Sequence, residues 1–175
     1  EKRDYISGEE MAKHFGVSRT AVWKNITKLK NEGYNIKSVS NKGYFLEETN
    51  DILNISEIEY DNTLFLETID STNEECKRQA VKGKNDGLLV VCDYQSAGKG
   101  RLGRTWVAES HDNLCMSFLL YPDISPMKAP QLTLLTGMAV CEAIKEVTGL
   151  NAGIKWPNDI QINSKKISGI LAEGV

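Results

Sequence analysis

The sequence predicts an α+β protein made of a small helix-rich module and a larger body with a mixed sheet. Residues 7–31 carry two apolar patterns at helical spacing, and the signal of a hairpin follows at 35–46. Further along, strand-like apolar runs at 87–93 and 114–121 alternate with helical patterns. A chain of 175 residues with this pattern is expected to hold one ordinary domain and a small one.

Charge divides the chain at the same place. Residues 1–47 contain nine Lys or Arg and six Asp or Glu, whereas the whole chain has a net charge of −3. The junction at 47–51 is acidic and polar, which is typical of a linker. We therefore expect a first domain at 1–48 and a second at 49–175. A basic module on an acidic body suggests an appended nucleic-acid-binding module.

The composition, 41% hydrophobic and 26% charged, is typical of a globular protein. No run approaches the roughly 18 apolar residues of a membrane helix, and no signal-peptide pattern opens the chain. We expect a cytoplasmic protein with no membrane partner. The cysteines are widely spaced, have no histidine partners and form no CxxC pair, so we expect no metal site and reduced core thiols. They are Cys76, Cys92, Cys115 and Cys141.

Two helices joined by a tight turn are expected in the first module. Residues 7–10, Ser-Gly-Glu-Glu, fit a capping box that opens a helix with an apolar stripe. Ser18 is a natural N-cap for the second helix. In that helix Val22, Ile26 and Leu29 fall on one face, which is the pattern of a helix packed on a core.

The hairpin and the polar face of the second helix complete a winged helix-turn-helix. Short strands are expected at 35–39 and 44–46, joined by a basic turn. The polar helix face carries side chains long enough to reach a DNA groove, and the hairpin is expected on the phosphates. The residues expected to contact DNA are Arg19, Thr20, Trp23, Lys24 and Lys42.

A small helical interaction domain with a solvated charged face is the alternative interpretation of this module. Its modest positive charge neutralises few phosphates, so one copy is expected to bind DNA weakly. Specific binding is expected to need a dimer that spans two half-sites.

Helices and strands are expected to alternate in the body. In chain order we expect a helix at 71–82, strands at 87–93 and 114–121, a helix at 130–147, and strands at 152–155 and 166–173 around a hairpin at 163–164. Ser71 and Thr72 each stand three residues before a glutamate, so simple N-capping is one account of the Ser71-Thr72-Asn73 trio. Gly169, inside the last strand, suggests the close approach of a ligand or of another backbone.

The most informative segment is 98–106, with the sequence Gly-Lys-Gly-Arg-Leu-Gly-Arg-Thr-Trp. Glycine lets the backbone approach an anion closely, and arginine grips a phosphate or carboxylate through two parallel hydrogen bonds. The segment therefore predicts a loop that holds a compact anionic ligand. A mobile surface turn with solvated charges is the alternative.

Two nucleotide-binding signatures do not fit this loop. Gly98, Gly100 and Gly103 match the spacing of the dinucleotide fingerprint. That fingerprint needs a helix to follow, and residues 104–113 carry no sustained helical pattern. The phosphate loop of nucleoside triphosphatases is excluded because its Gly-Lys-Ser/Thr ending is missing.

A second polar cluster, Lys-Trp-Pro-Asn-Asp at 155–159, ends a short apolar run. With the trio at 71–73, the loop at 95–106 and Lys-Ile-Ser-Gly-Ile-Leu-Ala-Glu at 166–173, it makes four motifs in order. Together they resemble the bifunctional biotin protein ligases of the biotin operon repressor type. The resemblance covers essentially the whole chain, as a winged helix-turn-helix followed by part of a class II synthetase-like catalytic domain with a mixed sheet.

The resemblance implies a two-step ligase. Biotin and ATP would form biotinyl-5′-adenylate with release of pyrophosphate, assisted by Mg²⁺, and the biotin would pass to a lysine of a biotin carboxyl carrier domain of acetyl-CoA carboxylase or a related carboxylase. The adenylate-bound form would dimerise and bind operator DNA to repress genes of biotin biosynthesis or uptake. Anionic reactants need cations and N–H groups aimed at them in advance, which agrees with the composition of the loop.

The resemblance also implies a role for each motif residue. The residues implied as catalytic are Lys155 and Arg101. Those implied to bind biotin are Ser71, Thr72, Asn73, Gln95, Lys99, Gly100, Arg101 and Lys155. Those implied to bind ATP or the adenylate are Arg101, Arg104, Trp106 and Asn158. Trp106 as a core anchor is an equal alternative, and Asn158 with Asp159 either organises Mg²⁺ or the nucleotide or only forms the turn.

The sequence departs from the family pattern in two places. Lys99 stands where arginine is usual, so a bidentate grip becomes a point charge, and Leu102 replaces what is often another arginine. The resemblance also implies a helix before residue 7, and a strand motif, a second loop and a small β domain after Val175. We therefore expect residues 1–175 alone to have little ligase activity.

Two other functions remain open. One is a biotin-sensing DNA-binding repressor with little ligase role, in which ordering of the glycine-rich loop completes a dimer surface. The other is a lipoate ligase relative, which the winged helix and the arginine-rich loop disfavour.

Overall fold

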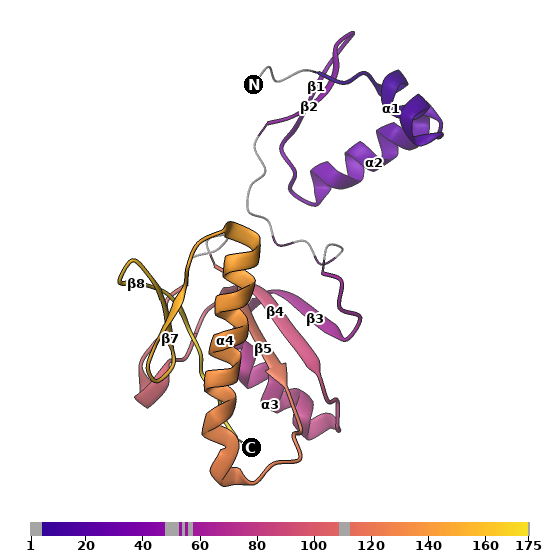
Figure 1. Cartoon of the computed structure of the whole chain (residues 1–175). Coiled ribbons are helices and arrows are strands. Elements are labelled where there is room, and N and C mark those ends of the chain that lie inside the picture. Colours follow the sequence, from indigo (N-terminus) through magenta and orange to yellow (C-terminus); the bar gives the residue numbers. More distant parts are fainter. Residues whose placement is uncertain (1–4, 48–52, 54, 56–57, 109–112, 175) are drawn as a thin grey trace. The chain divides into compact units, whose positions relative to one another are not determined.

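In this computed structural model, residues 5–47, 53, 55, 58–108 and 113–174 are described. The contacts divide the chain into two units, one of Glu1–Asp61 with Ser110–Leu114 and one of Asn62–Glu109 with Cys115–Val175 (Figure 1). The domain boundary expected between residues 48 and 49 falls outside the described residues.

The first unit contains the two expected helices, α1 (Gly8–Phe15) and α2 (Arg19–Asn31). The capping box of α1 is confirmed, because Ser7 Oγ accepts from Glu10 N at 3.1 Å and Ser7 N donates to Glu10 Oε2 at 2.9 Å. Ser18 caps α2 by accepting from the backbone N–H of Ala21. These local bonds satisfy N–H groups that an isolated helix end leaves unpaired.

The expected hairpin is confirmed as β1 (Ile36–Val39) and β2 (Gly43–Leu46), paired antiparallel. Tyr44 also pairs with Ile6, so the segment before α1 lies along the hairpin. A side chain at Gly43 would overlap the carbonyl of Ile6, and its φ is +110°, so this position requires glycine.

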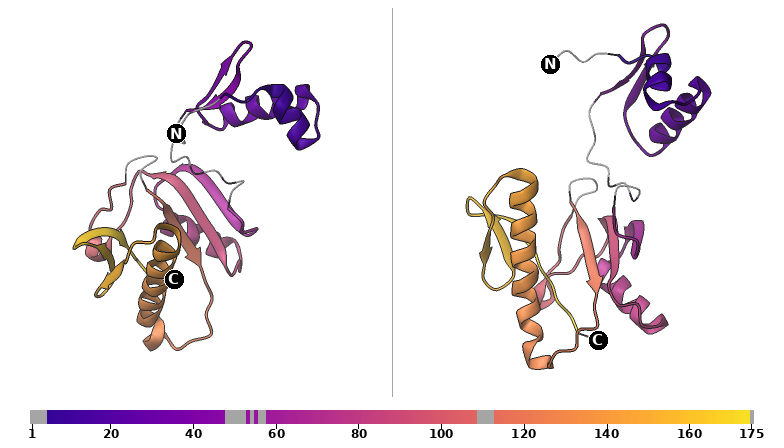
Figure 2. Two further views of the ribbon diagram at one scale, coloured as in Figure 1. Left: turned by 45° about the horizontal axis from the view of Figure 1, so that its top comes forward. Right: turned by 45° about the vertical axis from the view of Figure 1, so that its right-hand side comes forward.

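The second unit is built on a mixed three-stranded sheet in the order β3-β4-β5 (Figures 1 and 2). Its strands are β3 (Thr63–Ile69), β4 (Leu88–Gln95) and β5 (Cys115–Leu119). β3 runs parallel to β4, and β5 runs antiparallel to it. No strand was expected at the position of β3.

Helix α3 (Thr72–Lys82) follows β3 and packs on the sheet through a small apolar cluster. Cys76 lies in this cluster with Leu88, Val90 and Leu119. Cys92 and Cys115 lie opposite each other on β4 and β5 in a second cluster, and all the cysteines are free thiols. Cys76, Cys92 and Cys115 are therefore core residues as expected, whereas Cys141 is only half-buried.

A second sheet, β6-β7-β8, lies beside the long helix α4 (Ala129–Thr148), as both views in Figure 2 show. Its strands are β6 (Gly153–Lys155), β7 (Asp159–Ile162) and β8 (Lys165–Gly169). Gly149, which follows the helix expected at 130–147, closes α4 in the left-handed conformation. Across the described residues, no helix is both long and apolar enough to cross a membrane.

The last strand is shorter than expected, because β8 ends at Gly169 rather than near Glu173. After Gly169 the backbone groups no longer pair within the sheet and form hydrogen bonds with residues outside it. Ile170 N donates to Asn158 O at 2.9 Å, and Leu171 O accepts from the amide of Asn73 at 3.2 Å. Apolar sequence alone does not reveal this exchange of partners.

Candidate functional site

The glycine-rich loop after β4 is closed on itself. Trp106 N donates to Gly98 O at 2.8 Å, and Gly100 N donates to Arg104 O at 2.7 Å. A Cβ on Gly98 would lie 2.5 Å from the carbonyl oxygen of Trp106. The missing side chain at Gly98 is therefore required by the loop's own backbone, independently of any ligand.

The loop surrounds a hollow of about 620 Å³. Three of its lining residues are the cations Lys99, Arg101 and Arg104, and the opposite wall includes Leu171 and Glu173. One short 3₁₀ turn, Arg101–Gly103, follows Gly100, and the described residues between Arg104 and β5 contain no helix. The hollow can therefore hold an anion among side-chain cations, and the loop lacks the helix of a dinucleotide-binding site.

Arg101 connects the loop to the second polar cluster. Its Nη1 donates to Asn158 Oδ1 at 3.0 Å. Asn158 is fixed in turn by Ile170, whose carbonyl accepts from Asn158 Nδ2 at 3.1 Å. Lys155 ends β6 opposite Asp159 in the ladder, and it is exposed. Among the described residues its ammonium makes no hydrogen bond or ion pair, so it is free to meet an anion.

The trio at the start of α3 forms a polar network instead of a helix cap. Ser71 is the N-cap residue, but its side chain makes no capping hydrogen bond, so N-capping does not explain it. Thr72 donates both its N–H and its hydroxyl to Gln95 Oε1, at 2.8 and 3.1 Å. These two hydrogen bonds hold Gln95 beside Thr72. Ser71 and Thr72 are both buried.

Hydrogen bonds of the Asn73 side chain connect the start of α3 with β5 and with the segment after β8. Its amide nitrogen donates to Leu171 O and to Glu173 Oε2, and its Oδ1 accepts from the hydroxyl of Ser117. Ser117 Oγ also lies 2.8 Å from Thr72 Oγ1. Asn73 therefore uses both of its N–H groups within the protein, and a ligand that needs them must displace these bonds.

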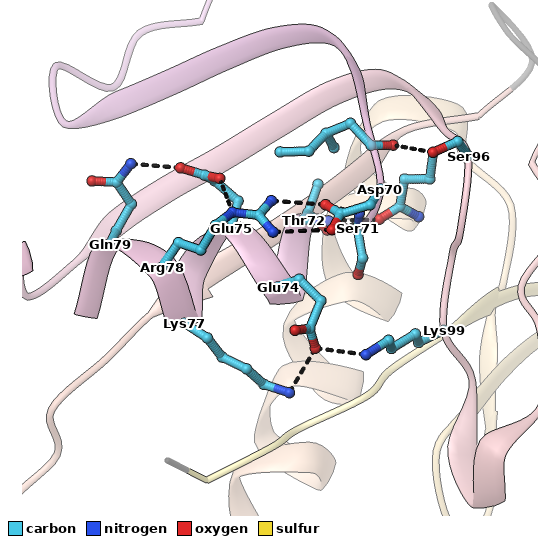
Figure 3. A network of polar contacts seen from close by, with 12 residues as sticks. Asp70, Ser71, Thr72, Glu74, Glu75, Lys77, Arg78, Gln79, Ser96 and Lys99 are labelled. Atoms are coloured by element: carbon cyan, nitrogen blue, oxygen red, sulfur yellow. Dashed lines mark hydrogen bonds and ion pairs between the residues drawn. The ribbon is translucent and has the colours of Figure 1, made fainter. Parts of the chain in front are cut away.

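A second network fixes the junction between β3 and α3 (Figure 3). Arg78 donates to both carboxylate oxygens of Asp70, at 2.7 and 3.0 Å, and its Nε donates to Glu75 at 2.7 Å. The hydrogen bonds from Arg78 and from the N–H of Ser71 lower the pKa of Asp70 to about 2.

Trp106 is a core anchor. Its ring packs against the cluster of Cys92, Cys115 and their neighbours. A Cβ on Gly169 would lie 3.1 Å from Trp106 Cζ3, so the space that Gly169 leaves is filled by this ring. The close approach expected at Gly169 is therefore made by an aromatic side chain. The ammonium of Lys166 lies 5.1 Å from the ring centroid.

Both side chains of the turn at 158–159 already have partners within the protein. Asp159 Oδ1 lies 2.8 Å from Lys166 Nζ, and Asn158 is engaged by Arg101 and Ile170. Within the described ranges, no group of three or more His, Cys, Asp or Glu is placed to hold a metal ion. These side chains do not fit a magnesium site at the turn.

The first unit carries a separate hollow of about 660 Å³ between its helices and the hairpin. Four of the five residues expected to contact DNA line it, and Lys24 does not. They are Arg19, Thr20, Trp23 and Lys42. All four are exposed or half-exposed, and the side chain of Trp23 is one of the exposed large apolar groups.

Comparison with known proteins identifies these two units. Residues 65–175 match the biotin/lipoate A/B protein ligase family, and residues 1–45 match an HTH domain. The chain belongs to the biotin/lipoate protein ligase family. Its HTH unit and mixed-sheet ligase domain confirm the predicted fold class.

Bifunctional relatives resemble this family member along nearly its whole length. It is 41% identical over 178 residues to the Bifunctional ligase/repressor BirA of Bacillus subtilis (strain 168), and 32% identical over 174 residues to that of Escherichia coli (strain K12). Each match covers 97% of this chain, and 55% and 54% of the respective relative. The chain therefore spans about half the length of these relatives.

Solved ligase structures resemble the second unit of this family member. The biotin protein ligase from Aquifex aeolicus in complex with biotin and ATP has a TM-score of 0.59 and 38% identity, over 65% of this chain and 47% of that one. The biotin protein ligase from Leishmania major in complex with biotinyl-5-AMP has a TM-score of 0.59 and 32% identity, over 66% and 53%.

Several residues of this ligase-family site were not found from sequence. Ser117, Glu74 and Lys77 contact motif residues but belong to no motif. Helical spacing pairs Glu74 with Lys77, but no local pattern places either of them beside Lys99.

Proposed function

We propose that the protein activates biotin with ATP to biotinyl-5′-adenylate and transfers the biotin to a lysine of a biotin carboxyl carrier domain, as a biotin–carboxyl-carrier-protein ligase. The Arg101–Asn158 hydrogen bond carries this proposal, because it joins the cationic loop to the turn after Lys155. Two motifs far apart in sequence thus meet at Arg101, which lines the hollow of about 620 Å³, whereas Lys155 and Asn158 are not among its lining residues.

In the first step a carboxylate oxygen of biotin attacks the α-phosphorus of ATP, and the bond from that phosphorus to the bridging oxygen of pyrophosphate breaks. Both reactants are anionic, so fixed cations lower the barrier by neutralising charge that accumulates in the transition state. The exposed, unpaired ammonium of Lys155 is proposed to meet the carboxylate and the α-phosphate. Arg101, and Arg104 in the loop wall, are proposed to hold the adenylate phosphate.

In the second step the lysine amine attacks the acyl carbon of the mixed anhydride, AMP leaves, and the amine loses a proton. Ser71, Thr72, Asn73 and Gln95 are proposed to hydrogen-bond the ureido ring of biotin, with Gly100 and Lys99 at its carboxylate end. Mg²⁺ is proposed to accompany the nucleotide through the phosphates of ATP, since the turn at 158–159 does not fit as its ligand.

Biotin-dependent exchange of pyrophosphate into ATP by the full-length protein tests this function. Lys155→Ala is expected to lower exchange by about 10²-fold, the effect of removing one group that stabilises transition-state charge. Lys145→Ala, an exposed lysine of the same unit at the end of α4, is the matched control and should exchange normally. Well-folded protein that shows no biotin-dependent exchange, or exchange that lipoate supports equally, would contradict the proposal.

A second function, operator binding and repression by the first unit, is proposed from the hollow that Arg19, Thr20, Trp23 and Lys42 line. It places the start of α2 beside the basic turn of the hairpin, as groove binding with phosphate contacts requires. A dimer in the adenylate-bound state is proposed as the binding form.

Arg19→Ala tests this second function. It is expected to weaken DNA binding, to reduce the salt dependence of binding by about one phosphate contact, and to leave pyrophosphate exchange intact. Lys13→Ala, a cation of α1 that does not line the hollow, is the control. Equal loss of DNA binding in both variants would indicate general charge attraction instead of this interface.

A further inference from the structure

Two side-chain contacts connect the glycine-rich loop to other parts of the second unit. On one side Arg101 binds Asn158 of the turn after β6. On the other, Lys99 Nζ donates to Glu74 Oε1 of α3 at 2.7 Å. The two ends of the loop are held separately, by backbone bonds from Ser96 and Ala97 to the end of β3 and by packing of Trp106 on the core, so the two side-chain contacts act on the cationic part between them.

Glu74 is itself held in place by neighbours outside the loop. Lys77, one turn along α3, donates to the same Oε1 at 2.8 Å (Figure 3). Its ammonium also donates to Glu173 Oε1 at 3.1 Å. Glu173 in turn accepts from the amide of Asn73 at 3.0 Å. The carboxylate that receives Lys99 is therefore part of a chain of bonds that runs from the loop to Asn73 and to the segment after β8.

Charge along this chain is balanced. Two ammonium groups, of Lys77 and Lys99, meet two carboxylates, of Glu74 and Glu173. The hydrogen bonds from Lys77 and Lys99 lower the pKa of Glu74, so it stays ionised at neutral pH. An ammonium has three N–H donors, and Glu74 takes one of them, so Lys99 keeps donors for a ligand anion.

We propose that Glu74 is a positioning residue that holds the Lys99 ammonium and its loop at the hollow in the orientation that receives the ligand carboxylate. The proposal rests on the proposed function for the identity of that ligand, which is biotin. The contact with Glu74 matters because residue 99 is a lysine. The ammonium of lysine lacks the planar geometry of an arginine guanidinium, so a neighbouring carboxylate is needed to orient it. Glu74 lies outside the four motifs that carry the resemblance to the family.

Glu74→Gln in the full-length protein removes the charge and keeps the size of the side chain. The KM for biotin in pyrophosphate exchange is expected to rise about 2- to 5-fold at low salt, with kcat nearly unchanged, because half-exposed ion pairs contribute modestly. The rise is expected to shrink at high salt, where the pair is screened. Glu142→Gln, an exposed carboxylate of α4, is the matched control and should leave KM unchanged.

A double-mutant cycle assigns the effect to Lys99. In a Lys99→Met background, Glu74→Gln is expected to add nothing further to KM. Hydrogen exchange of the backbone N–H groups at 98–106, measured without ligand, gives a readout independent of activity. It is expected to speed up in Glu74→Gln and in Lys99→Met, and to stay unchanged in Glu142→Gln.

The outcomes separate the two proposals. Wild-type protein without biotin-dependent exchange would overturn the proposed function, while faster hydrogen exchange in Glu74→Gln would still support the tether. If wild-type protein catalyses exchange, two results would overturn the positioning role alone. One is a Glu74→Gln variant with unchanged KM for biotin. The other is a Glu74→Gln substitution that raises KM as much in the Lys99→Met background as in wild type. A fall in KM would also overturn it, because Glu74 would then compete with the ligand for Lys99.

Discussion

Arg101 and Asn158 lie 57 positions apart in the chain, and a 3.0 Å hydrogen bond joins the guanidinium of the first to the side-chain oxygen of the second. The same Asn158 side chain donates to the carbonyl of Ile170. One amide thus connects the glycine-rich loop, the turn after β6 and the chain after β8.

Replacing Asn158 with alanine removes both bonds. Asn158→Ala is expected to lower the free energy of unfolding by about 1 kcal/mol, since the acceptor at Ile170 loses a half-buried partner. It should also weaken biotin-dependent exchange, because Arg101 loses its anchor. Chemical denaturation and exchange assays measure the two effects. Asn151→Ala, an exposed asparagine before β6, is the control, and an equal loss there would contradict the prediction.

Gly98→Ala tests whether the loop must close on itself. The added Cβ would lie 2.5 Å from the backbone oxygen of Trp106, so the loop has to open. Pyrophosphate exchange is expected to fall about tenfold or more, because the cations of the loop would be displaced from the positions in which they contact the ligand. Gly153→Ala has no heavy atom within 4 Å of its new Cβ and should exchange as wild type. Normal exchange by Gly98→Ala would show that closure of the loop is not needed.

Ser117→Ala tests the network beneath the trio. The hydroxyl that Asn73 Oδ1 accepts from is lost, and the polar atoms left behind are partly buried. The KM for biotin is expected to rise, and stability is expected to fall by about 1 kcal/mol. Ser125→Ala, an exposed serine with no side-chain cap bond, is the matched control. A Ser117→Ala variant with wild-type KM would place this network outside biotin binding.

The Asp70–Arg78 pair predicts a dependence of stability on pH. A carboxyl whose pKa is lowered from 3.8 to about 2 adds stability above its unfolded pKa and loses it as the pH falls through its folded pKa. The stability advantage of wild type over Asp70→Asn is therefore expected to shrink between about pH 4 and pH 2. At neutral pH it should be about 1 kcal/mol or less, because the pair is half-exposed and screened by solvent.

Denaturation curves of both proteins across that pH range measure this difference. Asp123→Asn, an exposed carboxylate without an ion pair among the described residues, is the control and should track wild type throughout. A constant difference between wild type and Asp70→Asn from pH 6 to pH 2 would show that the pair contributes no proton-linked stability.

Much of the fold follows from local sequence. The capping box at Ser7 and Glu10, the cap at Ser18 and the left-handed Gly149 each depend on groups within a few residues, so their patterns alone located the helix ends. β3 was missed because its apolar run is short, Leu64–Leu66, and the polar Glu67 and Thr68 follow it, which gives a weaker signal than the longer apolar run of β4.

Local patterns along the chain predicted most of the helices and strands, and the motifs that carry the resemblance to biotin protein ligases. The contacts between distant side chains could not be predicted in this way: Gln95 with Thr72, Asn73 with Glu173, and Glu74 with Lys99. The reason is physical. Helix caps and turns satisfy donors and acceptors close along the chain, whereas these pairs lie 23 to 100 positions apart and exist only once sheet register and helix packing have brought them together.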